Sequence, residues 1–86
     1  MSVTVTFYST AWCPFCVRAK RLLAAKGATV HEIDVDREPG ARQEMMARSG
    51  RRTVPQIWIG DRHVGGCDEL FALERAGELD SLLTAS

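Results

Sequence analysis

The stretch VTVTFYSTAWCPFC, residues 3–16, predicts the first two elements of the fold, a strand followed by a helix. Residues 3–8 are β-branched or aromatic throughout, which predicts a strand. Pro14 then suits the first turn of a helix, because the N–H that proline lacks would have no partner there. Two cysteines, Cys13 and Cys16, therefore lie directly after a strand and at the point where a helix begins.

Strand and helix patterns alternate beyond this stretch. The helix that starts at Pro14 is expected to carry an apolar stripe of Val17, Leu22 and Leu23 and to end at Gly27, which fits a C-terminal cap. The other expected elements are strands over 29–34, 56–59 and 62–64, a helix from Glu38-Pro39 to Gly50, and a last helix near Asp68 that Gly77 interrupts before a docked final turn.

The order of these elements is β-α-β-α-β-β-α. A strand-helix-strand crossover requires a parallel pair, whereas the hairpin that joins the last two strands makes them antiparallel. The sequence therefore predicts an α/β protein of thioredoxin-like fold, with a mixed four-stranded sheet flanked by three helices. With 86 residues the chain has room for one domain, expected to span 1–86.

Composition narrows the class of function. Eleven basic residues balance eleven acidic ones, which argues against a general nucleic-acid binder. No apolar run approaches the ~20 residues that span a bilayer, and residues 1–10 do not resemble a secretory signal, so we expect a cytoplasmic protein without a membrane segment. Three cysteines in a reducing compartment are more often catalytic or metal-binding than structural.

Cys13 and Cys16 are the candidate redox pair, because a C-x-x-C that opens a helix after a strand is typical of thiol-disulfide exchange. The unpaired N–H groups and the dipole of the helix N-terminus favour a thiolate on Cys13. Cys16, one turn into the helix, is more shielded. We therefore expect Cys13 to attack and Cys16 to resolve. The surrounding residues up to 31 carry four basic side chains and no acid, which fits either a solvated helix face or an electropositive surround.

Two other interpretations of this cysteine pair are a structural zinc site and a pair of buried packing residues. A structural zinc site usually needs four ligands, but only Cys67, His31 and His63 remain, and they are scattered singly along the chain. We therefore expect no metal. Two buried packing cysteines are common in cores, although Pro14 between the pair speaks against that interpretation.

A second motif is Thr53-Val54-Pro55. A residue before proline is extended, and a proline is tolerated where a strand begins. The motif could alternatively contain a cis bond that exposes the backbone of Val54 to an extended peptide. Taken alone, the pattern favours the simple start of a strand.

A third motif is Gly65-Gly66-Cys67-Asp68. The glycines let another backbone approach closely, and the helix start that follows can bind a carboxylate. Asp68 fits either a helix cap or a partner for the ammonium group of a ligand. Cys67 fits a small packing residue better than a reactive one.

Together these motifs resemble those of glutaredoxins over nearly the whole chain. The resemblance implies a glutathione groove in which Val54 pairs with the cysteinyl backbone, the N–H groups of Cys67 and Asp68 hold the γ-glutamyl carboxylate, and Asp68 takes the α-ammonium. Arg42 falls where the family often contacts the glycyl carboxylate, and Arg52 could assist. The implied set for glutathione is Thr53, Val54, Pro55, Gly66, Cys67, Asp68 and Arg42, with Pro14, Phe15 and Pro55 supporting the two cysteines.

The resemblance also implies an activity. Such a protein reduces protein disulfides and glutathione mixed disulfides, holds no permanent cofactor and uses glutathione as co-substrate. Its expected partners are glutathione, glutathione reductase acting through glutathione, and disulfide substrates such as ribonucleotide reductase. It is expected to be a monomer.

Three residues depart from the family pattern. Thr10 replaces a common lysine, Trp12 replaces a threonine or serine, and Phe15 replaces a tyrosine. Thr10 and Trp12 favour one alternative, an electron donor to ribonucleotide reductase that thioredoxin reductase recharges. Another alternative is a carrier of a glutathione-ligated iron–sulfur cluster, against which Pro14 and Cys16 argue.

Overall fold

The computed structural model describes residues 3–84. Of the expected domain 1–86, residues 1–2 and 85–86 lie outside the described part. The described elements run in the order β1 (Thr4–Ser9), α1 (Pro14–Ala25), β2 (Thr29–Asp34), α2 (Ala41–Ser49), β3 (Gln56–Ile59), β4 (Arg62–Gly65), α3 (Cys67–Arg75) and α4 (Leu79–Thr84).

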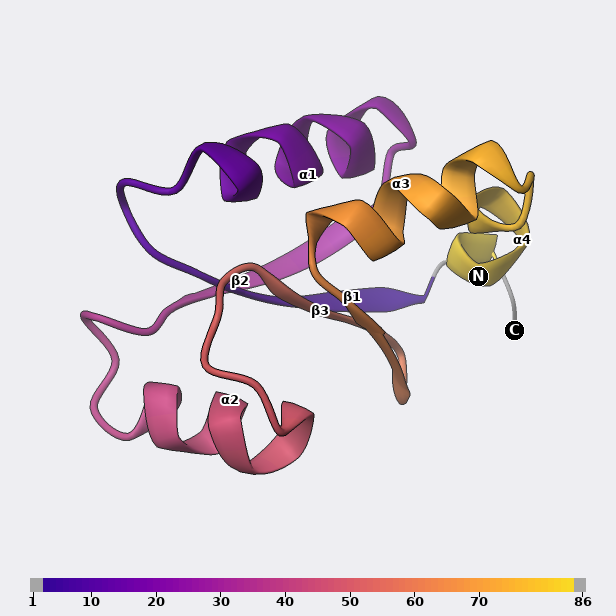
Figure 1. The fold of residues 1–86 in the computed structure, drawn as a ribbon. Coiled ribbons are helices and arrows are strands. Elements are labelled where there is room, and N and C mark those ends of the chain that lie inside the picture. The colour runs from indigo at the N-terminus through magenta and orange to yellow at the C-terminus, as the bar shows by residue number, and fades with distance from the viewer. Residues whose placement is uncertain (1–2, 85–86) are drawn as a thin grey trace.

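One mixed sheet organises the fold, with strand order β2-β1-β3-β4. Strand β1 pairs parallel with β2 and antiparallel with β3, and β3 pairs antiparallel with β4. Helices α1 and α3 cover one face of the sheet, and α2 covers the other (Figure 1). This is the predicted α/β thioredoxin-like architecture. Within residues 3–84 no helix is both long and apolar enough to cross a membrane.

The core is divided between the two faces by the alternation of side chains along each strand. Val5 and Phe7 are fully buried with Leu23 of α1 in the larger cluster. Tyr8, one residue on, is buried on the opposite face with Met45 of α2. Full burial of one such large apolar side chain contributes about 1.5–3 kcal/mol. The strand predicted from the β-branched and aromatic residues 3–8 therefore packs on both of its sides.

The described chain holds four helices, so the expectation of three is wrong in number. The last predicted helix is two separate helices, because Gly77 adopts φ +74° between α3 and α4. A left-handed residue cannot continue a right-handed helix, and glycine takes that conformation at little cost. The start of α2 also differs from the prediction. Gly40, at φ +80°, caps it, so the helix begins at Ala41 and leaves Glu38-Pro39 in the preceding turn.

The buried stripe of α1 also differs from the expected one. Leu23 is fully buried as predicted, but Val17 is 41% exposed. The buried residues are Cys16, Ala19 and Leu23, whose spacing of three and four keeps them on one helix face. Val17 lies one position away from that face, so its side chain turns to solvent.

Candidate active site

The first part of the site is the start of α1, which begins immediately after a short connection from β1. Cys13 is the N-cap residue, with extended backbone, and Pro14 occupies the first turn. The backbone N–H of Cys16 donates to the Cys13 sulfur over 3.1 Å. The first turn carries no acidic residue. An N–H group and the positive end of the helix thus face the sulfur with no carboxylate of that turn opposing them, which favours a thiolate.

Cys16 differs from Cys13 in its environment. Its side chain is 1% exposed. Burial, and then the hydrogen bond with Cys13, raise the pKa of the Cys16 thiol to about 12. Cys16 therefore stays protonated near neutral pH, while Cys13, at 9% exposed, is the less buried residue of the pair. This asymmetry suits an attacking and a resolving thiol.

The second part of the site is the segment before β3. The Val54–Pro55 peptide bond is cis, which is the alternative that the motif left open and not the simple strand start that the pattern alone favoured. The Cys13 sulfur lies 3.7 Å from the carbonyl oxygen of Val54, which accepts its hydrogen bond. Residues 41 positions apart in the chain are thereby brought into contact at Cys13.

The third part is the start of α3. Gly66 is its N-cap, and the N–H of Gly66 donates to Oε1 of Glu69 over 2.8 Å. The same Oε1 accepts from Nη1 of Arg51 over 2.7 Å. The Gly66 N–H and then Arg51 lower the pKa of the Glu69 carboxyl. Gly65, at φ +116°, leaves room for this carboxylate, because a Cβ there would collide with Oε1. Asp68 lies in the first turn of α3 and is not its cap.

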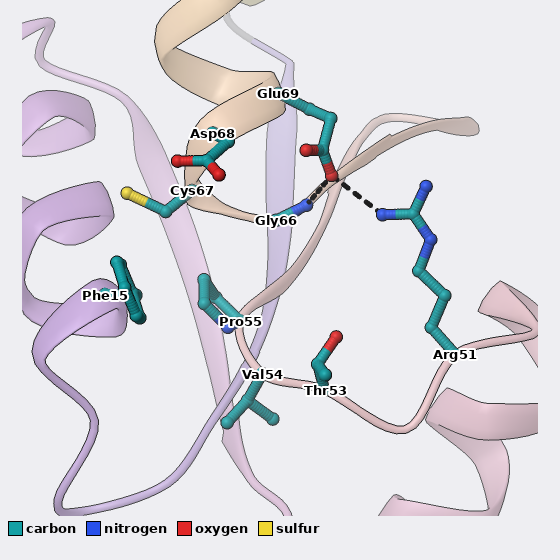
Figure 2. Close-up of a pocket in the computed structure, with 9 residues that line it drawn as sticks. All are labelled: Phe15, Arg51, Thr53, Val54, Pro55, Gly66, Cys67, Asp68 and Glu69. Atoms are coloured by element: carbon teal, nitrogen blue, oxygen red, sulfur yellow. Dashed lines mark hydrogen bonds and ion pairs between the residues drawn. The ribbon is translucent and has the colours of Figure 1, made fainter.

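These parts surround a pocket of about 350 Å³ (Figure 2). A volume of this order is typical of small-molecule sites. In the view of Figure 2, Phe15 and Pro55 both lie below the start of α3. The lining residues are Phe15, Arg51, Thr53, Val54, Pro55, Gly66, Cys67, Asp68 and Glu69.

The structure brings together every residue of the predicted glutathione set except Arg42. Arg42 lies on α2, where its Nη2 contacts Oδ1 of Asp36 over 2.7 Å, and it does not line this pocket. Arg51 and Glu69 line the pocket but were not predicted. The spacing of Glu69, three residues after Gly66, is that of a capping box and could have pointed to it. No local pattern singles out Arg51, because its partner lies 18 residues away.

Cys67 is a packing residue at this site, as its sequence context suggested. It is 5% exposed and belongs to the same core cluster as Cys13 and Cys16. Burial raises the pKa of its thiol, which keeps the sulfur protonated. The contribution of Cys67 to the pocket is therefore its backbone at the helix start.

Comparisons with known proteins agree with this geometry. A model of the glutaredoxin family matches residues 5–64. The chain is also 59% identical over 81 residues to a curated glutaredoxin of Pseudomonas aeruginosa, with 94% of this chain and 96% of the relative covered. The chain belongs to the glutaredoxin family. With its Cys13/Cys16 pair, this glutaredoxin is a thiol-disulfide oxidoreductase.

Two further relatives place this glutaredoxin within the family. It is 51% identical over 79 residues to glutaredoxin 3 of Escherichia coli K12, covering 92% of this chain and 95% of the relative. Its fold matches that of a buckwheat glutaredoxin solved as a complex with glutathione, with a TM-score of 0.87 and 34% identity. That match covers 93% of this chain and 76% of the buckwheat chain.

Proposed function

We propose that this glutaredoxin is a glutathione-dependent oxidoreductase that reduces glutathione mixed disulfides and protein disulfides. The observation that carries the proposal is the pocket beside Cys13, which joins the backbone of Val54 to the start of α3. Glutathione is an extended tripeptide with two carboxylates and one ammonium group. The N–H groups of Cys67 and Asp68 suit its γ-glutamyl carboxylate, the Asp68 carboxylate its ammonium, and the Val54 backbone its cysteine.

The second carboxylate of glutathione needs a cation, and the family's usual lysine position holds Thr10 here. Both arginines are ion-paired over 2.7 Å, Arg51 with Glu69 and Arg42 with Asp36, but only Arg51 lines the pocket. We therefore assign the contribution of positive charge at this end of the groove to Arg51. Such a charge draws anionic glutathione toward the site and adds rate rather than fold stability.

For a glutathione mixed disulfide, the Cys13 thiolate attacks the glutathione sulfur. A new disulfide forms between Cys13 and glutathione, the bond to the substrate breaks, and the substrate leaves as a thiolate that takes a proton. The thiolate of a second glutathione then attacks the bound glutathione sulfur. Oxidised glutathione leaves, Cys13 returns as a thiolate, and glutathione reductase with NADPH reduces the oxidised glutathione.

For a protein disulfide, Cys13 attacks one substrate sulfur and releases the other as a thiol. Cys16 then attacks the Cys13 sulfur and gives up its proton as the substrate's second thiolate leaves. An internal Cys13–Cys16 disulfide results, and two glutathione molecules reduce it. Family potentials of about −200 to −230 mV lie close to the glutathione poise, so this reduction is feasible.

The test follows reduction of a small glutathione mixed disulfide, coupled to glutathione reductase and NADPH. Wild type should be active and Cys13→Ser inactive. Cys16→Ser should keep this activity and lose the reduction of protein disulfides, because only the second reaction needs a resolving thiol. An inactive wild type would reject glutathione dependence. We further propose that residues 1–86 form one domain and that the protein is a monomer that works in the cytoplasm. We also propose that its substrates include proteins such as ribonucleotide reductase.

One observation favours a second candidate, recharging by thioredoxin reductase. Trp12, directly before the nucleophile, is 95% exposed and offers an apolar contact to another protein. If thioredoxin reductase with NADPH reduces the Cys13–Cys16 disulfide and glutathione does not, this candidate replaces the first.

A further inference from the structure

Gln56 is a fully buried polar side chain in an otherwise apolar strand. Its exposed fraction is 0%, and the three residues that follow it in β3 are buried and apolar. Burying an amide costs free energy unless its hydrogen bonds are made inside the protein. An aliphatic side chain would fill the same space without that requirement, so the partners of the Gln56 amide show what the residue contributes.

The amide nitrogen of Gln56 is bonded to Thr53, at the edge of the glutathione pocket. Nε2 donates to the Thr53 carbonyl oxygen over 2.9 Å and approaches the Thr53 hydroxyl at 3.2 Å. Because a carbonyl oxygen can only accept, the orientation of the amide is fixed. Its oxygen then faces Nε2 of His63 at 2.8 Å, and His63 must donate.

His63 is itself held in place on β4. Its ring stacks on Trp58, with centroids 4.6 Å apart and planes inclined by 28°. The guanidinium of Arg48 lies 4.4 Å from the centroid of the Trp58 ring. Burial, followed by the positive charge of Arg51, lowers the pKa of His63, so the ring is neutral near pH 7 and carries its proton on Nε2. The protonated ring also donates from Nε2, so the bond to Gln56 exists in both charge states.

The segment that these bonds hold has no regular structure of its own. Residues 51–55 lie between α2 and β3, outside any helix or strand. The Val54 carbonyl in this segment meets the Cys13 sulfur, and Thr53 and Val54 line the pocket. In a strand, backbone hydrogen bonds to a neighbouring strand would hold these residues. Here the side-chain hydrogen bonds from Gln56, in the sheet, hold Thr53 instead.

We propose that Gln56 and His63 are positioning residues, which anchor Thr53 to the sheet so that the backbone of Val54 is oriented for both Cys13 and glutathione. The proposal rests on the glutathione-dependent function proposed above. Neither side chain touches the ligand in this arrangement. Their effect passes through Thr53, and it should therefore appear in binding of glutathione more than in the reactivity of the thiol.

The first experiment compares the KM for the glutathione mixed disulfide and kcat in Gln56→Leu, His63→Phe and a control, Gln43→Leu. Gln43 is an exposed glutamine on α2. Loss of the bond to Thr53 should raise KM about tenfold, equal to about 1.4 kcal/mol, with kcat changed less than about twofold. His63→Phe keeps an aromatic ring to stack on Trp58 but lacks the donor, so we expect about a threefold rise. Gln43→Leu should leave both constants unchanged.

A second measurement separates positioning from general destabilisation and does not need glutathione. Amide hydrogen exchange of residues 51–54 should become faster in Gln56→Leu, while alkylation of Cys13 by iodoacetamide keeps its rate. An unchanged KM in folded Gln56→Leu would overturn the proposal, as would parallel losses in KM, kcat, alkylation and Tm. If the wild type itself shows no turnover with glutathione, the proposed function fails, and the exchange of residues 51–54 alone then decides whether Gln56 anchors the segment.

Discussion

Two helices of this glutaredoxin have a cysteine at their N-terminus, Cys13 as the N-cap of α1 and Cys67 as the first residue of α3, and the two helix starts have different chemistry. At α1, Cys13 is the N-cap, and its sulfur accepts the N–H of Cys16. At α3, Gly66 is the N-cap, and Glu69 accepts the N–H of Gly66. The Cys67 sulfur, one position inside the helix, is buried in the core.

The first turns of α1 and α3 also differ in their acidic residues. The first turn of α1 holds no acid, whereas that of α3 holds Asp68 and Glu69. The positive end of α1 is thus available to a sulfur anion, while that of α3 is partly occupied by its own carboxylates. The comparison teaches that the start of α1 suits a sulfur anion better than the start of α3, because its cysteine is the cap and no first-turn acid competes.

The largest expected effect is in thiol reactivity. With iodoacetamide at pH 7.5 the reduced protein should be labelled at Cys13 at least about a hundredfold faster than at Cys67 or Cys16, because burial keeps both of the latter protonated. Peptide mass spectrometry would locate the label, and unfolding in urea should make all three sites react alike. Rapid labelling of Cys67 in the folded protein would contradict the contrast between the helices.

A smaller effect is expected when the Glu69 side chain, which accepts the N–H of the N-cap residue Gly66, is removed. Glu69→Ala should lower the free energy of unfolding by about 1 kcal/mol, because the Gly66 N–H loses its partner. Urea denaturation would measure it, with Glu38→Ala, in the exposed turn before α2, as control. Equal stability of wild type and Glu69→Ala would show that the capping interaction does not stabilise α3.

The same pair has a predicted pH dependence. The pKa of Glu69 is lowered in the folded protein, so the unfolded chain takes up its proton at higher pH. The stability that Glu69 contributes is therefore complete above the ordinary carboxyl value of 4.5 and is lost as the pH falls below it. The difference between wild type and Glu69→Ala should shrink in that acidic range.

The smallest expected effect comes from placing an acidic residue in the first turn of α1, as the first turn of α3 already has. Val17 is half-exposed and lies at the end of the first turn. Compared with Val17→Gln, Val17→Glu should slow the alkylation of Cys13 at neutral pH about two- to fivefold, because a charge near a helix N-terminus contributes about 0.3–1 kcal/mol. The difference should vanish in about 1 M salt, which screens exposed charges. A Val17→Glu rate equal to the Val17→Gln rate in low salt would show that charge in the first turn of α1 does not influence Cys13.

Much of the fold follows from local patterns. The β-branched and aromatic run in residues 3–8, the proline after Cys13 and the hairpin between the last two strands each depend on near neighbours in the chain, and the structure confirms the elements they predict. The errors lie where a single backbone conformation decides. Gly40 is left-handed, and this moves the start of α2 to Ala41. The interruption at Gly77 was predicted, but the expected final turn is a helix of its own, α4.

The site was less predictable than the fold. Its cysteines and glycines are recognisable as motifs, but the arginine that lines the pocket is Arg51, and Arg42 instead pairs with Asp36. Both arginines are flexible and charged, and nothing in their local sequence distinguishes them. Which one reaches the pocket depends on where the end of α2 lies relative to the start of α3.

The sequence by itself determined the order of strands and helices and the placement of Cys13 at a helix start, because hydrogen bonds and side-chain spacing within a few residues decide these. Only the tertiary structure decided that the Val54 carbonyl meets the Cys13 sulfur, that Glu69 joins Gly66 to Arg51, and that Gln56 anchors Thr53. The first two join elements far apart in the chain. The third arises because β3 turns the amide back toward the preceding segment while the sheet excludes water from it.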